Sequence, residues 1–137
     1  MRRVLFVCTG NIFRSLTAEH ALRRALPGGS RIAVASAGTD DFPHVVRPNV
    51  REYLYGKGFD VSSHQRRTLT RGLIEDSDLV IAMSTDHRAH IRDRFQKDAL
   101  LFLEACGGPG EPRTCGHRIS AWLRPALPTA RRRPCCP

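Results

Sequence analysis

Residues 3–8, Arg-Val-Leu-Phe-Val-Cys, are followed at once by Thr9-Gly10-Asn11 and, from Ser15, by a helical pattern. The first stretch is a nearly continuous apolar run, which is typical of a strand buried on both faces of a parallel sheet. Between residues 18 and 26 the apolar positions recur at spacings of three and four, which predicts a helix that ends at Pro27-Gly28-Gly29. A buried strand that leads through a tight loop into a helix is the first unit of an α/β fold.

The rest of the chain repeats this alternation. Strand-like runs cover residues 31–37, 78–83 and 99–103, and helical patterns cover residues 49–57 and, with Thr85 as the cap, 85–95. The alternation predicts a doubly wound, four-stranded parallel sheet with helices on both faces. Such sheets bind ligands beyond the carboxyl ends of their strands, where the loop after residue 8 lies.

Length and composition narrow the class of protein. The chain has 137 residues, which predicts one domain without disulfide support, and no apolar run approaches the length of a membrane span. Five cysteines form neither a disulfide framework nor a zinc pattern, so we expect a reduced, cytoplasmic protein without metal or cofactor. We expect a monomer that binds neither membranes nor a specific nucleic acid.

The charge is uneven along the chain. The formal net charge is +9, but six Arg and no acidic residue follow position 112, so residues 1–112 carry 16 basic and 13 acidic residues, or +3. The basic charge therefore belongs mostly to residues 113–137, an atypical tail rich in Arg, Pro and Cys. Plausible codons for residues 113–122, read one base earlier, encode Pro-Asp-Val-Arg-Pro-Pro-Asp-Phe-Gly-Met. We consider two hypotheses for the unusual composition of this tail: a shift of the reading frame in the coding sequence, or a disordered segment.

The loop after the first strand carries the chemistry. Its sequence from residue 8 to 15 is Cys-Thr-Gly-Asn-Ile-Phe-Arg-Ser. A loop between a strand and a helix can aim backbone N–H groups inward as an anion site, and Gly10 and Asn11 tolerate the positive φ that a tight loop needs. Arg14 can form two hydrogen bonds with a phosphate, and the same positive field favours the thiolate of Cys8. One loop thus offers a nucleophile, an anion cradle and a cationic clamp.

This loop resembles the signature of the low-molecular-weight protein tyrosine phosphatases, Cys-x-Gly-Asn-x-x-Arg-Ser. Residues 36–39, the surroundings of His64 and residues 78–83 also look like that family, and the resemblance covers about residues 3–112. It implies a flavodoxin-like fold, a phosphatase-like domain at 1–112 and a phosphocysteine intermediate, with a phosphotyrosine protein or a small aryl phosphate as substrate. It implies catalytic roles for Cys8, Arg14 and Ser15. It also implies a phosphate-binding loop of Thr9, Gly10, Asn11, Ile12, Phe13 and Arg14, held in shape by Asn11, Ser36 and His64.

The sequence departs from the family in two places. The family usually has an Asp-Pro in its C-terminal loop whose Asp protonates the leaving group, whereas no Asp follows Asp98 here, and Glu111-Pro112 is the candidate replacement. Phe13 stands where many relatives have a second cysteine. Loss of the acid predicts an impaired phosphatase.

Three alternative functions stay open. The first is a phosphate- or phosphopeptide-binding module without turnover, which keeps the cradle but lacks the acid. The second is a protein-arginine phosphatase, whose loop tends to carry Thr where this chain has Ile12. The third is an arsenate reductase, which needs two further cysteines that relay to Cys8.

Overall fold

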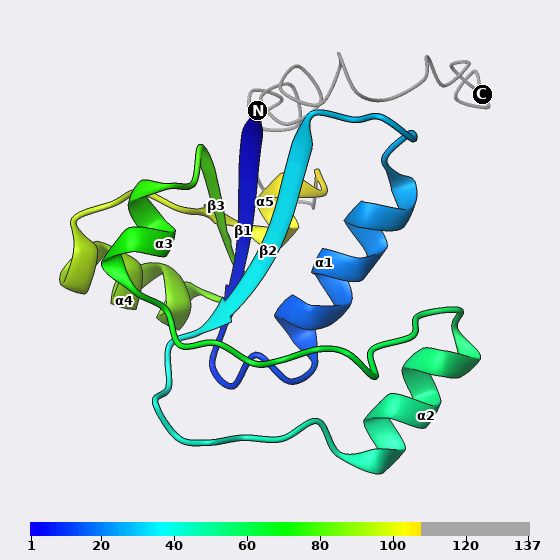
Figure 1. Ribbon diagram of the computed structural model, residues 1–137. Coiled ribbons are helices and arrows are strands. Elements are labelled where there is room, and N and C mark those ends of the chain that lie inside the picture. The colour runs from blue at the N-terminus through cyan, green and yellow to red at the C-terminus, as the bar shows by residue number, and fades with distance from the viewer. Residues whose placement is uncertain (108–137) are drawn as a thin grey trace, which may run out of the picture.

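The computed structural model describes residues 1–107 (Figure 1). The tail at 113–137 and the candidate acid Glu111 lie outside these residues. Strands and helices alternate within the described part in this order: β1 (Arg2–Cys8), α1 (Arg14–Ala25), β2 (Ile32–Gly38), α2 (Pro48–Gly56), α3 (Arg71–Glu75), β3 (Leu79–Ala82), α4 (Thr85–Phe95), β4 (Leu100–Leu101) and α5 (Phe102–Ala105).

The four strands form one parallel sheet in the order β2-β1-β3-β4. Val4 of β1 pairs with Val34 of β2 on one side and with Leu79 of β3 on the other. The chain therefore winds outward from β1 to β2 and then crosses back to β3, so the direction of winding reverses beside β1. This is the flavodoxin-like, doubly wound arrangement that the sequence predicted, with the loop after β1 at the point where the winding reverses.

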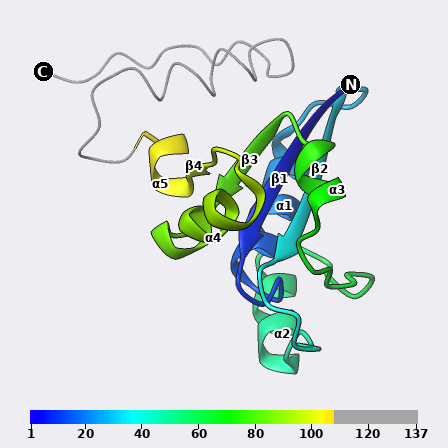
Figure 2. The same ribbon diagram turned by 90° about the vertical axis from the view of Figure 1, so that its left-hand side faces the viewer.

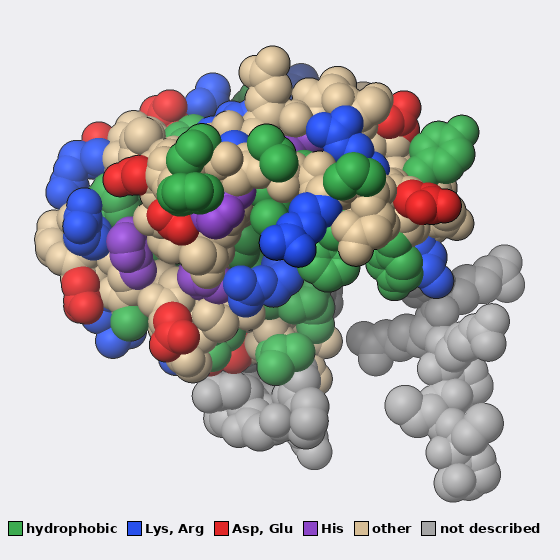
Figure 3. Space-filling model, turned by 90° about the horizontal axis from the view of Figure 1, so that it is seen from below, with side chains coloured by type: hydrophobic (Ala, Val, Ile, Leu, Met, Phe, Trp, Pro, Cys, Tyr) green, Lys and Arg blue, Asp and Glu red, His purple; other side chains and the backbone are tan. Residues whose placement is uncertain are grey.

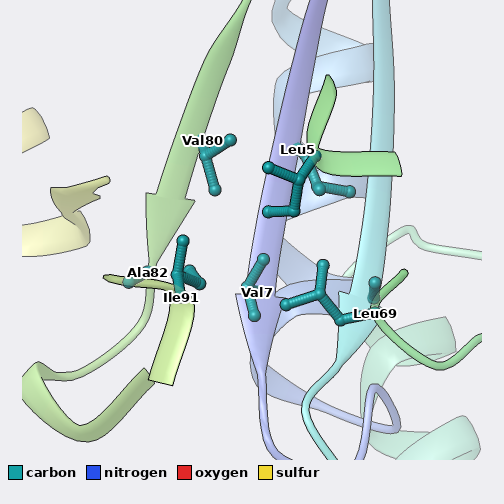
Figure 4. Packing of buried hydrophobic residues seen from close by; sticks show 8 residues of the cluster. Leu5, Val7, Leu69, Val80, Ala82 and Ile91 are labelled. Atoms are coloured by element: carbon teal, nitrogen blue, oxygen red, sulfur yellow. The ribbon is translucent and has the colours of Figure 1, made fainter. Parts of the chain in front are cut away.

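Helices cover both faces of the sheet because successive residues of β1 point to opposite sides. Leu5 and Val7 pack with β3 and with residues of α3 and α4 in one cluster, part of which is shown in Figure 4. Val4 and Phe6 pack on the opposite face against α1 and α5. Figures 1 and 2 show α1 on one side of the sheet and α3 and α4 on the other.

The C-terminal part of the described chain differs from the prediction. The strand expected at 99–103 was wrong in its extent, because β4 covers Leu100–Leu101 alone and the next residues turn into α5. Glu104 explains this early turn, since its carboxylate accepts a hydrogen bond from the Leu101 N–H at 3.0 Å and also pairs with Arg88 of α4 at 3.0 Å.

Two further details at helix starts were not predicted. Thr85 was expected to be the cap of the helix at 85–95, but α4 already includes Thr85, and Ser84 occupies its N-cap position. The five-residue α3 is too short to show a helical period in the sequence. Its N-cap is Thr70, whose side chain accepts from the Leu73 N–H at 3.3 Å. No helix within residues 1–107 is long and apolar enough to cross a membrane.

Candidate functional site: the loop between β1 and α1

The loop from Cys8 to Arg14 lies at the carboxyl end of the sheet, beside α2 (Figure 1). Cys8 is the last residue of β1 and is buried, whereas Arg14 is the exposed first residue of α1. Phe13 occupies the N-cap position of α1, and its side chain has no acceptor for the free N–H groups of the first turn. The positive end of the helix dipole therefore faces the loop without a side-chain cap.

The first two carbonyl groups of the loop bond to the segment that follows β2. The carbonyl of Cys8 accepts from the Thr39 N–H at 2.8 Å, and the carbonyl of Thr9 accepts from the Asp40 N–H at 3.0 Å. These bonds continue the parallel pairing of β1 and β2 beyond the end of both strands. They fix the direction in which the first two peptide units of the loop point.

The next two carbonyl groups bond to side chains from the segment before α3. The carbonyl of Gly10 accepts from Nε of Arg66 at 3.1 Å, and that of Asn11 accepts from Nε2 of His64 at 2.9 Å. Arg66 also donates to the carbonyl of Asp40 through Nη2. The segment that carries these side chains is held beside β2, because the Leu69 N–H donates to the carbonyl of Gly38 at 2.7 Å.

All four carbonyl groups of residues 8–11 thus point to partners around the loop. In a planar trans peptide the N–H of the next residue points the opposite way, so the N–H groups of residues 9–12 point toward the inside of the loop. The Asn11 N–H agrees with this, since it donates to Sγ of Cys8 at 3.2 Å. Converging N–H groups at a helix N-terminus form a site for an anion, with the sulfur of Cys8 at its base.

A fixed chain of hydrogen bonds surrounds the Cys8 sulfur. Nδ2 of Asn11 donates to Oγ of Ser15 at 2.9 Å, and Oγ of Ser15 lies 2.9 Å from Sγ of Cys8. Because the Ser15 oxygen already accepts from Asn11, its own proton is available to the sulfur. A thiolate at Cys8 can only accept, so in that state both the Ser15 hydroxyl and the Asn11 N–H would donate to it and stabilise the negative charge on sulfur.

Behind the loop, the same amide connects to a buried carboxylate. Nδ2 of Asn11 also donates to Oγ of Ser36 at 2.8 Å, and the Ser36 hydroxyl donates to the carboxylate of Glu19. Glu19 is 3% exposed and is paired with Arg23 one turn further along α1. A buried carboxylate needs partners of this kind, so Glu19 fixes the direction of the Ser36 hydroxyl and, through it, the amide of Asn11.

Two backbone features allow this close packing. Asn11 has φ of 55°, the left-handed conformation that Asn tolerates better than most residues. Gly38 at the end of β2 lies directly against the loop, since a Cβ atom placed there would meet the carbonyl oxygen of Thr9 at 2.5 Å. A side chain at position 38 would therefore displace the loop.

Arg14 and Thr9 lie on the side of the loop that faces α4. Nη2 of Arg14 donates to Oγ1 of Thr9 at 3.5 Å, and Thr9 in turn lies 2.8 Å from Nε2 of His87. His87 is buried, and its Nδ1 lies 2.9 Å from Oγ of Ser84. Burial lowers the pKa of His87 below its ordinary value, and the positive charge of Arg14 lowers it further.

Aromatic side chains lie beside the loop. The rings of Phe13 and Tyr53 meet edge to face with centroids 6.3 Å apart, and Phe42 lies 5.0 Å from the ring of His44. Ile12, by contrast, turns away from this rim and packs against the buried cluster between α1 and α2. Seen from this end of the molecule, Lys, Arg and His side chains gather near the middle of the face, with hydrophobic side chains around them (Figure 3).

The comparisons with known proteins agree with this geometry. Residues 3–103 match the family model of the low molecular weight phosphotyrosine protein phosphatases. The chain belongs to this family. It is 34% identical over 94 residues to a probable low molecular weight protein-tyrosine-phosphatase, EpsP, from Ralstonia solanacearum, and the match covers 69% of this chain and 63% of that protein. It is 36% identical over 94 residues to the protein-arginine-phosphatase of Bacillus subtilis, a match that covers 67% of this chain and 62% of that protein.

A solved structure shows the same fold. The structure of a YwlE mutant from Bacillus subtilis superposes with a TM-score of 0.66 at 30% identity, covering 91% of this chain and 90% of that one. The curated relatives, however, are longer than the matched region, and the match spans less than two thirds of their length.

The structure places Ser36 and His64, which the sequence singled out, against the loop, whereas the side chain of Ile12 turns away from its rim. Three further residues were not singled out: Glu19 behind Ser36, Arg66 on the Gly10 carbonyl, and His87 beside Thr9. Glu19 had one available signal, since it stands four residues before Arg23 on the predicted helix, the spacing of an ion pair. Within residues 1–107 no three His, Cys, Asp or Glu side chains come together as a metal site requires.

Proposed function

We propose that this chain hydrolyses aryl phosphate monoesters, phosphotyrosine in proteins among them, through a phosphocysteine intermediate on Cys8. The observation that carries the proposal is the outward direction of the four carbonyl groups of residues 8–11, which turns the following N–H groups away from these partners, with the Asn11 N–H on the Cys8 sulfur at 3.2 Å. A pentavalent phosphoryl group in transfer carries its charge on equatorial oxygens, and converging N–H groups with an adjacent guanidinium are suited to stabilise it.

In the first step, the thiolate of Cys8 attacks phosphorus and a sulfur–phosphorus bond forms. The bond between phosphorus and the aryl oxygen breaks, and this oxygen leaves with the electron pair and takes up a proton from the surrounding solvent. Arg14 and the N–H groups of the loop hold the three equatorial oxygens during the transfer.

In the second step, water attacks the phosphorus, the sulfur–phosphorus bond breaks and inorganic phosphate leaves. The sulfur recovers its electron pair and its negative charge, while the water loses its proton to the surrounding solvent. The Ser15 hydroxyl, 2.9 Å from the sulfur, donates to it as this charge develops. Ser15 therefore makes the sulfur a better leaving group in this step.

Three residues would keep the cradle in shape for both steps. Asn11 bonds to Ser15 and Ser36, and His64 holds the carbonyl of Asn11. None of the three needs to touch the substrate for this role. Their contribution is the fixed position of the N–H groups, which then need no reorganisation when charge develops.

The substrate class follows from the rim of the loop. Phe13, Phe42 and Tyr53 are exposed large side chains beside a cationic opening. An aryl phosphate places its ring among such side chains when its phosphate is in the cradle. The protein-arginine-phosphatase relative suggests phosphoarginine as a second substrate to test, although Ile12 stands where that group tends to carry Thr.

We also propose that protonation of the leaving group is impaired in this protein, since no Asp follows Asp98 and Glu111 is the candidate replacement. The catalytic unit would be residues 1–112, with 113–137 as a tail outside it, and the protein would act as a cytoplasmic monomer without a cofactor. Sequencing of the coding DNA tests the proposed change of reading frame directly.

The direct test of function uses Cys8→Ser on the full chain, with Cys106→Ser, an exposed cysteine, as the matched control. Turnover of p-nitrophenyl phosphate should fall to background in Cys8→Ser because a hydroxyl is not ionised at neutral pH, while inorganic phosphate still binds. Cys106→Ser should keep full turnover. Mass spectrometry after rapid quenching should find a phosphoryl group on Cys8. Phosphate binding without turnover in the unmodified chain would favour the binding-module alternative.

A further inference from the structure

His87 connects helix α4 to the phosphate-binding loop through a single hydroxyl group. His87 is 4% exposed, and both nitrogens of its ring have partners, with Nδ1 2.9 Å from Ser84 Oγ and Nε2 2.8 Å from Thr9 Oγ1. The two partners lie on opposite sides of the ring, so the imidazole cannot rotate without losing both contacts. The position of the Thr9 hydroxyl is therefore determined by a buried group outside the loop.

Thr9 in turn contacts the exposed side chain of Arg14. A guanidinium has no acceptor, so in the contact of 3.5 Å between Nη2 of Arg14 and Oγ1 of Thr9 the arginine is the donor. Among residues 1–107 this is the one side-chain hydrogen bond that Arg14 makes. A free arginine side chain loses up to about 2 kcal/mol of rotamer entropy when it is fixed, so a contact that restrains it before binding reduces the cost of binding.

We propose that His87 is a positioning residue for the phosphate clamp: through the Thr9 hydroxyl it holds the guanidinium of Arg14 beside the cradle before substrate arrives. The inference rests on the proposed function, because it assigns Arg14 to the phosphoryl oxygens. His87 acts through Thr9 and does not touch the substrate. A neutral imidazole would suit this task, since an imidazolium so close to Arg14 would repel the guanidinium, and burial lowers the pKa of His87.

The alternative is that His87 only fills space between α4 and the sheet. The two roles predict different effects for substitutions that replace the imidazole by a side chain with a single nitrogen. The amide nitrogen of glutamine lies near the position of Nε2, whereas that of asparagine lies near the position of Nδ1. His87→Gln therefore keeps a partner for Thr9, and His87→Asn keeps a partner for Ser84 alone.

The experiment measures the dissociation constant of inorganic phosphate by calorimetry and kcat/KM for p-nitrophenyl phosphate. We expect His87→Asn to weaken both about tenfold, as for loss of a hydrogen bond that supports a charged group, and His87→Gln to stay within about twofold of the unmodified chain. His90→Asn is the matched control, because His90 lies on the same helix and contacts Phe95 instead of the loop. It should leave both constants unchanged.

Measuring His87→Asn in a chain that also carries Thr9→Val distinguishes a positioning role of His87 from a packing role. Thr9→Val removes the hydroxyl at nearly constant volume, and should by itself weaken phosphate binding about tenfold. If His87 acts through this hydroxyl, His87→Asn should cost nothing more in the Thr9→Val background. If His87 is only a packing residue, its cost should be the same in both backgrounds, and that result would overturn the proposal.

The remaining outcomes are also decisive. Equal constants for the Asn and Gln variants would overturn the proposal, whether both are unchanged or both are weakened. If His87→Asn does not fold, the phosphate affinities of Thr9→Val and Thr9→Ser are compared instead, since only the serine keeps the hydroxyl. Equal affinities of these two variants would contradict the proposal. Failure of the proposed function can be distinguished from failure of this inference. In that case the unmodified chain would bind phosphate without any turnover, and the dissociation constants for phosphate would still test the role of His87.

Discussion

Nδ2 of Asn11 donates to Oγ of Ser36 at 2.8 Å, although the two residues are 25 positions apart in the chain. The bond joins the loop between β1 and α1 to the neighbouring strand β2. The same amide group bonds to Ser15, and its oxygen accepts from the Arg67 N–H at 3.1 Å. One buried side chain thus joins the loop, the start of α1, the strand β2 and the segment before α3.

Replacing Asn11 separates the effect of its backbone from that of its amide. Asn11→Gly keeps the φ of 55° without strain but removes the amide, so Ser15 and Ser36 each lose a buried partner. We expect the free energy of unfolding to fall by about 2–3 kcal/mol in urea titrations. Asn11→Ala should cost about 1 kcal/mol more, because alanine in this conformation is strained. Equal stability of the two variants would mean that the backbone conformation carries no cost.

Much of this arrangement could be predicted from local sequence. The order of strands and helices follows from apolar runs and periods, and the helix predicted through Phe95 ends at that residue in α4. The loop residues were predicted because they are neighbours in sequence. The family resemblance added Ser36 and His64, which lie far from the loop in the chain.

The three site residues that the sequence did not predict differ from the predicted loop residues in one respect. Glu19, Arg66 and His87 act through contacts that the fold creates, such as the 56 positions between Arg66 and Gly10. A single sequence contains no periodic signal for such a contact. The strand expected at 99–103 was overextended for a similar reason, since the carboxylate of Glu104 turns the chain at Leu101 by a side-chain contact that apolar periodicity does not register.

Gly38 should be intolerant of any side chain. A Cβ atom there would lie 2.5 Å from the carbonyl oxygen of Thr9, so Gly38→Ala must push the loop away from β2. A displacement near 1 Å at a catalytic group costs about a hundredfold in rate, and we expect a loss of that order in kcat for p-nitrophenyl phosphate. Gly28→Ala is the matched control, because a Cβ atom at Gly28 meets nothing within 4 Å. Unchanged turnover in Gly38→Ala would show that the loop can shift freely.

Arg14→Lys should be severe even though the charge is kept. A lysine offers a point charge instead of the planar fork that binds two phosphate oxygens at once. We expect kcat/KM for p-nitrophenyl phosphate to fall by about a hundredfold to a thousandfold, with a smaller loss in affinity for inorganic phosphate. Arg71→Lys on α3, whose guanidinium lies over the ring of Phe95, should leave both constants unchanged. A loss of less than about threefold in Arg14→Lys would remove the bidentate contact from the mechanism.

The stability of the protein should fall as the solution becomes acidic. Burial lowers the pKa of His87 below 6.5 in the folded state, so below about pH 6.5 the unfolded chain takes up this proton first. The stabilisation is complete above pH 6.5 and is lost as the pH falls through the folded-state pKa. Thermal unfolding between pH 7.5 and 5 should therefore show a falling midpoint, with a shallower fall in His87→Gln. His20, whose pKa is also lowered by burial, should account for part of the remaining slope.

The leaving group offers the sharpest test of the proposed impairment. Loss of a general acid typically costs about 10²–10⁴ in rate, and the cost is greatest when the departing oxygen is a strong base. The p-nitrophenolate ion needs little protonation, whereas the phenol of tyrosine is much more basic. In the proposed mechanism, Cys8, the N–H groups of the loop and Arg14 would stabilise the transferring phosphoryl group in both cases.

We therefore expect measurable turnover of p-nitrophenyl phosphate and much weaker turnover of phosphotyrosine on the same preparation, with Cys8→Ser as the blank. The ratio of the two kcat values is the quantity to compare, because it cancels errors in the active fraction of the protein. Similar kcat values for both substrates would mean that an acid is present. Glu111→Gln would then test whether Glu111 is this acid. If it is, the variant should lose turnover of phosphotyrosine and keep most of its turnover of p-nitrophenyl phosphate.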